Sequence, residues 1–295
     1  MDLTISLLLA VYNGEEFLKE SLEVPLKYVD QAVVVDGSPS GPSSDGTKGV
    51  IDELSLAYPD KIQYTAGTFA NEDGTWATGT QKTVALSHVT GNYVIQHEAD
   101  MVYSEQDMER LIEAIGRCHP RGIIYFPLID FWLTQDRIRL YSSERMYCRP
   151  RVGVIPVFST AYNPFYGPTA EVHLDDESIS NSVYLHDIFR YHYGWMGFRR
   201  QFNKHLRNVL GRRWGEEMEA YRTGPREDLV KWIVGHILDY PTYPYALPFM
   251  GQEPASMRDK RLSYLDGMAE TILELEDEYH TSLRGLVIER GGYVE

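Results

Sequence analysis

The sequence predicts an α/β protein, with a mostly parallel sheet flanked by helices and a mainly helical C-terminal region. Short apolar runs at 4–11, 31–36 and 93–96 are typical of strands buried on both faces. Segments with helical spacing separate these runs, and strands that alternate with helices form parallel sheets. Polar residues follow all three runs, at the strand ends where ligands bind such sheets.

The first half of the sheet is predicted in chain order. After the strand at 4–11, Asn13 and Glu16 predict a capping box that opens a helix through Tyr28. The strand at 31–36 runs into a Gly-, Ser- and Pro-rich loop. One face of a second helix is then marked by Val50, Ile51, Leu54 and Tyr58.

The second half repeats this alternation. A short strand is predicted at 61–65, a helix at 81–89 that stops before Gly91, and a strand at 93–96. Ser104 and Asp107 predict the cap of another helix, which Pro120 ends. A fifth strand is predicted at 122–126.

The pattern then changes, which predicts three regions. Residues 1–130 form the predicted ligand-binding core. Residues 131–195, rich in aromatic residues and Pro-containing turns, form a mixed β part of the same domain. Residues 196–295 form a helical extension, whose last helix carries an apolar stripe from Leu262 to Leu275.

Composition restricts the class of protein. A net charge of −15 over 295 residues argues against nucleic-acid binding, which depends on basic surface. The two cysteines, Cys118 and Cys148, are too few for a disulfide framework and indicate reduced thiols. No secretory signal or membrane span is visible, so we expect a cytoplasmic protein.

The carboxylates of Glu98 and Asp100 are the strongest chemical signal. They follow the strand at 93–96 and are separated by one residue, so an extended chain points both side chains to one side. At the end of a buried strand, such a pair can hold a divalent cation through its oxygens. The alternative interpretation is a pair of solvated loop charges.

Four segments, in order, resemble glycosyltransferase family 2, the inverting enzymes of the GT-A fold. Residues 10–13, Ala-Val-Tyr-Asn, are similar to the family's "P-x-Y-N" loop, with Ala10 in place of Pro. Residues 33–38, Val-Val-Val-Asp-Gly-Ser, are similar to its "vVDDgS" segment. Residues 79–93 resemble the stretch before the metal motif. Residues 98–100, Glu-Ala-Asp, match its "D-x-D" motif, with Glu in the first place.

The resemblance implies a donor site and a metal site. It places the nucleotide-sugar against Ala10, Tyr12, Asn13, Asp36, Gly37, Ser38, Lys82 and Glu98. It places Mn²⁺ or Mg²⁺ on Asp100 and Glu98, with His192 of a "H-y-G-w"-like segment as the third ligand. The alternative for His192 is a core histidine. His97 is left out, because strand alternation points it away from Glu98.

An inverting transfer also needs a base to deprotonate the acceptor hydroxyl. The family usually supplies a carboxylate beyond the metal motif, and the acidic cluster at 171–177 follows it here. Within this cluster we favour Asp176 or Glu171, although neither matches the family's motif cleanly. The alternative for the cluster is an acidic surface loop.

These observations predict a metal-dependent inverting glycosyltransferase of the hexosyltransferase type. It would move a sugar from a UDP- or GDP-sugar to an acceptor hydroxyl on a glycan, a lipid phosphate or a protein. A basic run between Arg199 and Arg213 suggests peripheral contact with the inner membrane face, or else is a solvated helix face.

Two other functions are alternatives to this prediction. One is a non-catalytic nucleotide- or sugar-binding module on the same fold, which the unmatched base motif favours. The other is a sugar-phosphate nucleotidyltransferase, which the sequence disfavours because residues 13–16, Asn-Gly-Glu-Glu, stand where its Gly-rich, Arg-containing loop belongs.

Overall fold

The computed structural model describes the elements of two compact units of the chain. The described residues are 3–72, 74, 76–132, 134–139, 149–156, 179–197, 224–225, 228, 246–258, 260 and 262. The first unit comprises Met1–Pro127, Pro150–Arg190 and Pro254–Met257, and the second comprises Leu128–Arg149, Tyr191–Glu253 and Arg258–Glu295. The predicted region boundaries near residues 130 and 195 stay predictions.

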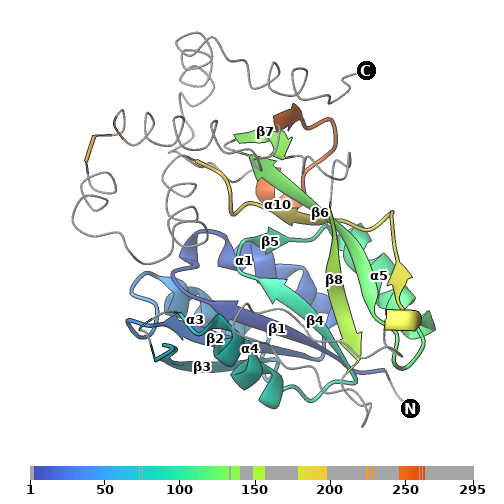
Figure 1. Ribbon diagram of the computed structural model, residues 1–295, viewed down its shortest axis with the longest axis horizontal. Helices are drawn as coiled ribbons and strands as arrows, with labels where there is room; N and C mark the ends of the chain where they lie inside the picture. Colours follow the sequence, from blue (N-terminus) through green and yellow to red (C-terminus); the bar gives the residue numbers. More distant parts are fainter. Residues whose placement is uncertain are drawn as a thin grey trace. The chain divides into compact units, whose positions relative to one another are not determined.

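The first unit contains a mostly parallel sheet, as predicted (Figure 1). Its strands lie in the order β8-β4-β1-β2-β3, and β1 to β4 are mutually parallel. β8 runs antiparallel to β4. The bounds are β1 Ile5–Val11, β2 Gln31–Ser38, β3 Ile62–Thr68, β4 Tyr93–Glu98 and β8 Arg149–Pro156. The short strands β5 (Met101–Val102) and β9 (Val183–Tyr184) were not predicted.

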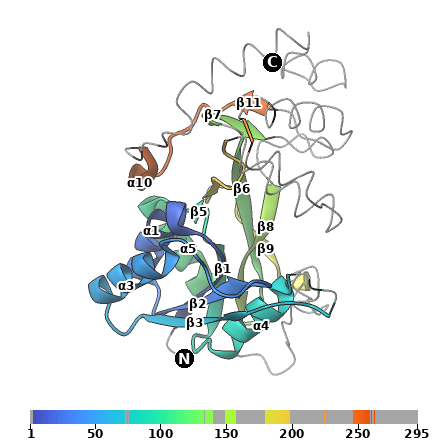
Figure 2. The same cartoon turned by 90° about the vertical axis from the view of Figure 1, so that its left-hand side faces the viewer.

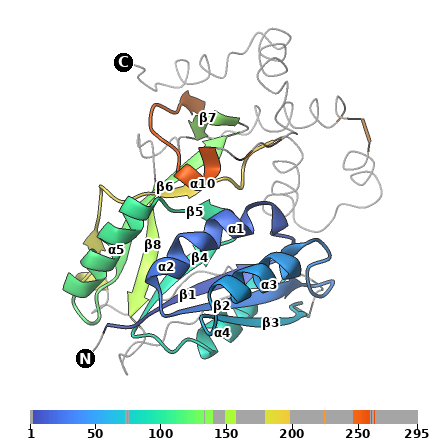
Figure 3. The same cartoon turned by 180° about the vertical axis from the view of Figure 1, so that it is seen from behind.

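Helices cover both faces of this sheet. Figure 1 shows α4 (Thr78–Ser87) on one face, and Figure 3 shows α1 (Glu15–Glu23), α2 (Pro25–Tyr28) and α3 (Thr47–Ala57) on the other. The side chains of β1 alternate accordingly: Leu7 and Leu9 pack in the core of the α1 and α3 face, whereas Leu8 packs toward α4. The continuous apolar runs thus form strands buried on both faces.

Two predicted helix starts have different outcomes. Ser104 caps α5 (Glu105–Arg117) as predicted, because its hydroxyl accepts a hydrogen bond from the Asp107 amide. The predicted Asn13 cap is wrong. Gly14 is the N-cap of α1, and Asn13 instead has a left-handed φ of 49° and accepts a hydrogen bond from the Ser44 amide through Oδ1. Asn13 therefore holds the loop after β2.

The second unit is antiparallel where it is described. β6 (Ile124–Trp132) and β10 (Arg190–His192) run into it from the first unit. Within it, β7 (Thr134–Arg139) pairs with β6 and with β11 (Ala246–Pro248), and Figure 2 shows β7 beside β11. The Phe131 ring contacts Tyr193 and Phe249, with centroids 4.7 and 5.0 Å apart.

Several predicted features lie outside the described residues. They are the basic run from Arg199, most of the helical extension, Cys148 and the acidic cluster at 171–177. The short helix α10 (Ala255–Arg258) belongs to the described part. Among the helices that the structure describes, none combines the length and the apolar character that crossing a bilayer requires.

Candidate functional site

The predicted site residues of the first unit gather at the carboxyl ends of β1, β2 and β4. Strand register places Glu98 beside Ala10, and Ala10 beside Val35, the residue before Asp36. Neighbouring strands lie about 4.8 Å apart, so the ends of β4 and β2 are separated by about 10 Å. That edge carries Ala10, Tyr12, Asn13, Asp36, Gly37, Ser38, Glu98 and Asp100.

Glu98 and Asp100 form a pair of suitable size for a cation. A carboxylate oxygen of each lies within 4.8 Å of one of the other. A divalent cation binds oxygens at 2.0–2.6 Å, so one ion can bridge the pair. Both side chains are partly exposed, which leaves access for a ligand. The residues present therefore fit the predicted Mn²⁺ or Mg²⁺.

Lys82 adds a positive charge next to this pair. It lies in α4, is only 8% exposed, and its Nζ is 4.0 Å from Oε1 of Glu98. Since Glu98 pairs with Ala10 on β1, its side chain lies on the α4 face of the sheet, as Lys82 requires. The site thus combines carboxylates for a cation with an ammonium group for an anion.

His97 lies on the opposite face, as strand alternation predicts. It is fully buried, and its Nε2 lies 3.0 Å from the carbonyl oxygen of Ser21 in α1. A carbonyl only accepts, so Nε2 carries the proton. Burial lowers the pKa of His97 to about 4, and the ring is therefore neutral at pH 7.

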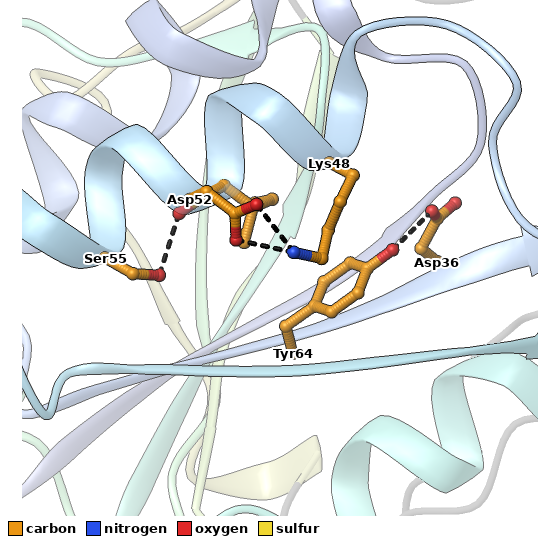
Figure 4. Close-up of polar contacts among 6 residues, drawn as sticks. Asp36, Lys48, Asp52, Ser55 and Tyr64 are labelled. Atoms are coloured by element: carbon orange, nitrogen blue, oxygen red, sulfur yellow. Dashed lines mark hydrogen bonds and ion pairs between the residues drawn. The ribbon is translucent and has the colours of Figure 1, made fainter.

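The carboxylate of Asp36 already accepts hydrogen bonds from other residues of the protein. It is 1% exposed. Its carboxylate accepts hydrogen bonds from the Ser43 amide at 3.1 Å, the Ser43 hydroxyl at 2.5 Å and the Tyr64 hydroxyl at 2.8 Å. Figure 4 shows Tyr64 pointing at Asp36, with Lys48 beside the same ring and paired with Asp52. Burial raises the pKa of the Tyr64 hydroxyl, so this donor stays protonated.

The loop after β2 is fastened from several directions. Asn13 donates its backbone amide to the Ser43 hydroxyl at 2.7 Å, and Glu15 accepts from the Gly46 amide at 2.8 Å. At Gly37, a Cβ atom would lie only 2.1 Å from the carbonyl oxygen of Gly67. Gly37 is thus required by the close approach of β2 to β3. The loop after β2 is therefore held in one position beside an exposed strand end, which is a suitable place for a ligand to bind.

Gln81 organises the same edge from α4 and was not predicted. It is fully buried, and its Nε2 donates to the carbonyl oxygens of Val11 at 3.1 Å and Val35 at 2.8 Å. Its Oε1 accepts from the Trp76 indole, whose ring lies edge-on to Tyr12 with centroids 5.6 Å apart. Gln81 therefore fixes two strand ends and an aromatic pair together.

In the second unit, His192 is buried and paired. It is 4% exposed, and its Nδ1 is hydrogen-bonded to Oδ1 of Asp130, which is 2% exposed. The predicted role of His192 as a metal ligand stays a prediction, as do the roles of Asp176 and Glu171, which lie outside the described residues.

Sequence reasoning missed Ser43, Tyr64 and Gln81, which hold the strand ends of the first unit, and Asp130, which pairs with His192 in the second. The spacing of residues along the chain does not reveal these partners. Asp130 carried the only usable signal, a single carboxylate inside the apolar run Ile-Tyr-Phe-Pro-Leu-Ile-Asp-Phe-Trp at 124–132. A charge within a buried strand indicates a specific partner.

The fold is that of an α/β protein with a mostly parallel sheet covered on both faces, and a pair of carboxylates lies at its strand ends. The sequence profile of "Glycosyl transferase family 2" matches residues 6–207, and the chain belongs to this family. The predicted family and its GT-A fold class are thus confirmed.

Curated relatives match over a shorter stretch. An uncharacterized glycosyltransferase of Rickettsia conorii is 27% identical over 133 residues, which cover 43% of this chain and 20% of the relative. A second, from Rickettsia bellii, is 26% identical over 133 residues, covering 43% of this chain and 17% of the relative. The match spans about a fifth of the length of these relatives.

Solved structures resemble the chain at low identity. The crystal structure of S. aureus TarS 1–349 has a TM-score of 0.43 and 12% identity, covering 99% of this chain and 93% of that one. Glucosyl-3-phosphoglycerate synthase from Mycobacterium tuberculosis, crystallised with Mn²⁺, UDP-glucose and phosphoglyceric acid, has a TM-score of 0.44 and 15% identity. That comparison covers 64% of this chain and 71% of the synthase.

Proposed function

We propose that this protein is a metal-dependent inverting glycosyltransferase that moves a sugar from a nucleoside diphosphate sugar to an acceptor hydroxyl. One observation carries the proposal: Glu98 and Asp100 offer oxygens within 4.8 Å at the end of β4, with the Lys82 ammonium 4.0 Å from Glu98. Two carboxylates and a cationic side chain suit a cation together with a diphosphate. Membership of the family supplies the reaction class.

The nucleotide is proposed to bind along the ends of β1 and β2, against Tyr12, Asn13, Gly37 and Ser38. The family resemblance places Asp36 against the nucleotide, where a carboxylate can accept hydrogen bonds from the base or the ribose. Its carboxylate already accepts three from Ser43 and Tyr64. Its contribution is therefore proposed to be the ordering of the loop that begins after Ser38, on which the base or ribose then rests.

The cation, Mn²⁺ or Mg²⁺, is proposed to bind Asp100, Glu98 and His192. When bound, such an ion stabilises the charge that builds on a departing diphosphate. Lys82 holds the phosphates by its charge. Support for His192 comes from the family resemblance of its segment, Tyr-His-Tyr-Gly-Trp at 191–195.

The acceptor side rests on family resemblance and on the sequence. Asp176 or Glu171 is proposed as the base that removes the proton of the acceptor hydroxyl. The basic run from Arg199 to Arg213 is proposed to receive an anionic acceptor or a membrane surface. Substituting Asp176 and Glu171 separately by Asn and Gln would identify the base, since only its loss should abolish transfer while nucleotide binding persists.

A thermal-shift panel tests the donor and the cation together. UDP, GDP, CDP and dTDP are each added with Mn²⁺ or with EDTA. A ligand that binds only the folded state raises the unfolding midpoint, so one nucleotide is expected to stabilise the protein when Mn²⁺ is present and much less with EDTA. The absence of any shift with every nucleotide and Mn²⁺ would contradict the proposal.

Hydrolysis of the donor separates the enzyme from the non-catalytic binding module. Both bind a nucleotide, but only an enzyme with a working metal site slowly transfers the sugar to water. Release of the nucleoside diphosphate from the stabilising donor, measured with Mn²⁺ and without acceptor, supports the enzyme. Binding without release under Mn²⁺ or Mg²⁺ supports the module.

A further inference from the structure

A chain of hydrogen bonds within the first unit joins the end of β1 to β2 and β3. The Asn13 amide donates to the Ser43 hydroxyl at 2.7 Å, and this hydroxyl donates to Oδ1 of Asp36 at 2.5 Å. The Tyr64 hydroxyl donates to the other carboxylate oxygen, Oδ2, at 2.8 Å (Figure 4). The chain thus links Asn13, a residue of the proposed nucleotide site, to a tyrosine two strands away.

The proton positions in this chain follow from the chemistry of its members. A backbone amide can only donate, so the Ser43 oxygen accepts from Asn13 and its own proton is left for Asp36. An ionised carboxylate can only accept, so the Tyr64 hydroxyl is the donor to Oδ2. Burial raises the pKa of Tyr64, which keeps this proton in place at neutral pH. The Asp36 carboxylate is therefore the acceptor on which the whole chain ends.

The conformation of Asn13 depends on these contacts. Its φ of 49° lies in the left-handed region, which residues other than glycine rarely occupy unless their neighbours hold them there. Besides the Ser43 hydroxyl, the Ser44 amide holds Asn13 by donating to its Oδ1 at 2.9 Å. Both contacts come from the loop after β2, and Asp36 holds that loop through the amide and the hydroxyl of Ser43. A displacement of Asp36 would therefore also displace Asn13 and its neighbour Tyr12.

We propose that Tyr64 is a positioning residue for the nucleotide: its hydroxyl fixes Asp36 and, through Ser43, sets the position of Asn13 and Tyr12. This inference rests on the proposed function, in which Tyr12 and Asn13 contact the nucleotide. The ring of Tyr64 packs against the core on the α1 and α3 face. Tyr64→Phe keeps this packing and removes only the hydroxyl, so it separates positioning from folding.

Isothermal titration measures the effect on nucleotide affinity. UDP, GDP, CDP and dTDP are titrated, each with Mn²⁺, and the variants are compared for whichever nucleotide the wild type binds. Tyr64→Phe is expected to raise the Kd about tenfold, because apparent affinity falls with the fraction of molecules in the binding conformation. Ser43→Ala should weaken binding at least as much. Ser43→Thr keeps a hydroxyl and should bind with a Kd within about twofold of the wild type.

Tyr28→Phe is the matched control for Tyr64→Phe. Tyr28 ends α2, before the start of β2, and its hydroxyl also donates to a carboxylate, that of Glu109, at 3.2 Å. The substitution removes the same kind of hydrogen bond from the same unit, so its Kd should equal that of the wild type.

Hydrogen exchange measures the link itself and needs neither nucleotide nor metal. Mass spectrometry follows the exchange of backbone amides in peptides that contain Asn13 or Ser43, which reports local opening of the two segments. Tyr64→Phe should speed exchange in both peptides, whereas α5 should exchange as in the wild type. Faster exchange in α5 as well would indicate a general loss of stability and would overturn the inference.

The outcomes separate this inference from the proposed function. If the wild type binds none of the four nucleotides, the proposed function fails and the inference falls with it. If the wild type binds one and Tyr64→Phe binds it as tightly as Tyr28→Phe does, only the role of Tyr64 is wrong. If Tyr64→Phe weakens binding without faster exchange around Asn13 and Ser43, Tyr64 contacts the nucleotide directly and is no positioning residue.

Discussion

Asp100 supplies a carboxylate oxygen to the proposed cation. The residues next to it in the sequence, Ala99 and Met101, have no oxygen in their side chains. Its partner Glu98 is already engaged with Lys82 at 4.0 Å. Asp100→Ala is expected to abolish the Mn²⁺-dependent part of nucleotide binding. It should also lower turnover by about 1,000-fold, since a metal ion contributes several kcal/mol of charge stabilisation. Isothermal titration and donor-hydrolysis rates measure the two effects.

Asp52→Asn is the control for this variant. Asp52 is an exposed carboxylate on α3 that pairs with Lys48 and has no place in the site. The substitution removes the same charge from the same unit, so nucleotide binding and turnover should stay at wild-type values. An Asp100→Ala protein as active as Asp52→Asn would refute the metal assignment.

His97 links burial to the pH dependence of stability. Its pKa is about 4 in the folded protein, against about 6.5 when unfolded. His97 is therefore protonated below about pH 6.5 in the unfolded chain, but only below about pH 4 in the folded protein. Stability contributed by neutral His97 is complete above pH 6.5 and is lost as the pH falls, by roughly 2 kcal/mol between pH 7 and pH 5.

Urea unfolding at pH 7, 6 and 5 measures this effect. His97→Gln should reduce the loss of unfolding free energy over that range by roughly 2 kcal/mol, because glutamine does not titrate. Equal slopes in the wild type and in His97→Gln would show that the folded protein does not keep His97 neutral.

The position of α4 depends on a single buried amide. Gln81 donates to the carbonyl oxygens of Val11 and Val35 and accepts from Trp76, so it joins the helix to two strands and a loop. Gln81→Leu fills the space but leaves polar groups without this partner. We expect it to lower the free energy of unfolding by about 2–4 kcal/mol, since each unsatisfied buried group costs about 1–3 kcal/mol.

Chemical denaturation checks this value, with Thr83→Ala as the control on the same helix. The exposed Thr83 hydroxyl only donates back to the Gly79 carbonyl, so its loss should change stability by less than about 0.5 kcal/mol. Gln81→Leu should also weaken nucleotide binding, because the ends of β1 and β2 carry the proposed seat. A Gln81→Leu protein as stable as Thr83→Ala would contradict the role of Gln81.

Stability of the whole chain should depend on nucleotide and cation jointly. At 100 times the Kd, a ligand adds about 2.7 kcal/mol to the free energy of unfolding. The stabilising nucleotide with Mn²⁺ should therefore raise the thermal midpoint by several degrees, and excess EDTA should reverse most of the rise. Equal midpoints with and without EDTA would mean that the nucleotide binds without the cation.

Much of the first unit could be predicted from sequence because its signals are local. Apolar runs predicted β1, β2 and β4, and Ser104 predicted the start of α5. Asn13 showed the limit of that approach. Its side chain can either cap a helix or bind a distant loop. In the structure it accepts a hydrogen bond from the amide of Ser44, 31 residues away. Local pattern does not reveal such competition.

The sequence by itself determined which residues end the strands, and therefore where carboxylates and a cation can meet. Only the tertiary structure decided which of these groups remain available. It engages Asp36 with Ser43 and Tyr64, brings Lys82 to Glu98, and pairs Asp130 with His192. The physical reason is that these contacts join residues that lie 7 to 62 positions apart in the chain. Residue type and spacing do not encode these neighbours directly.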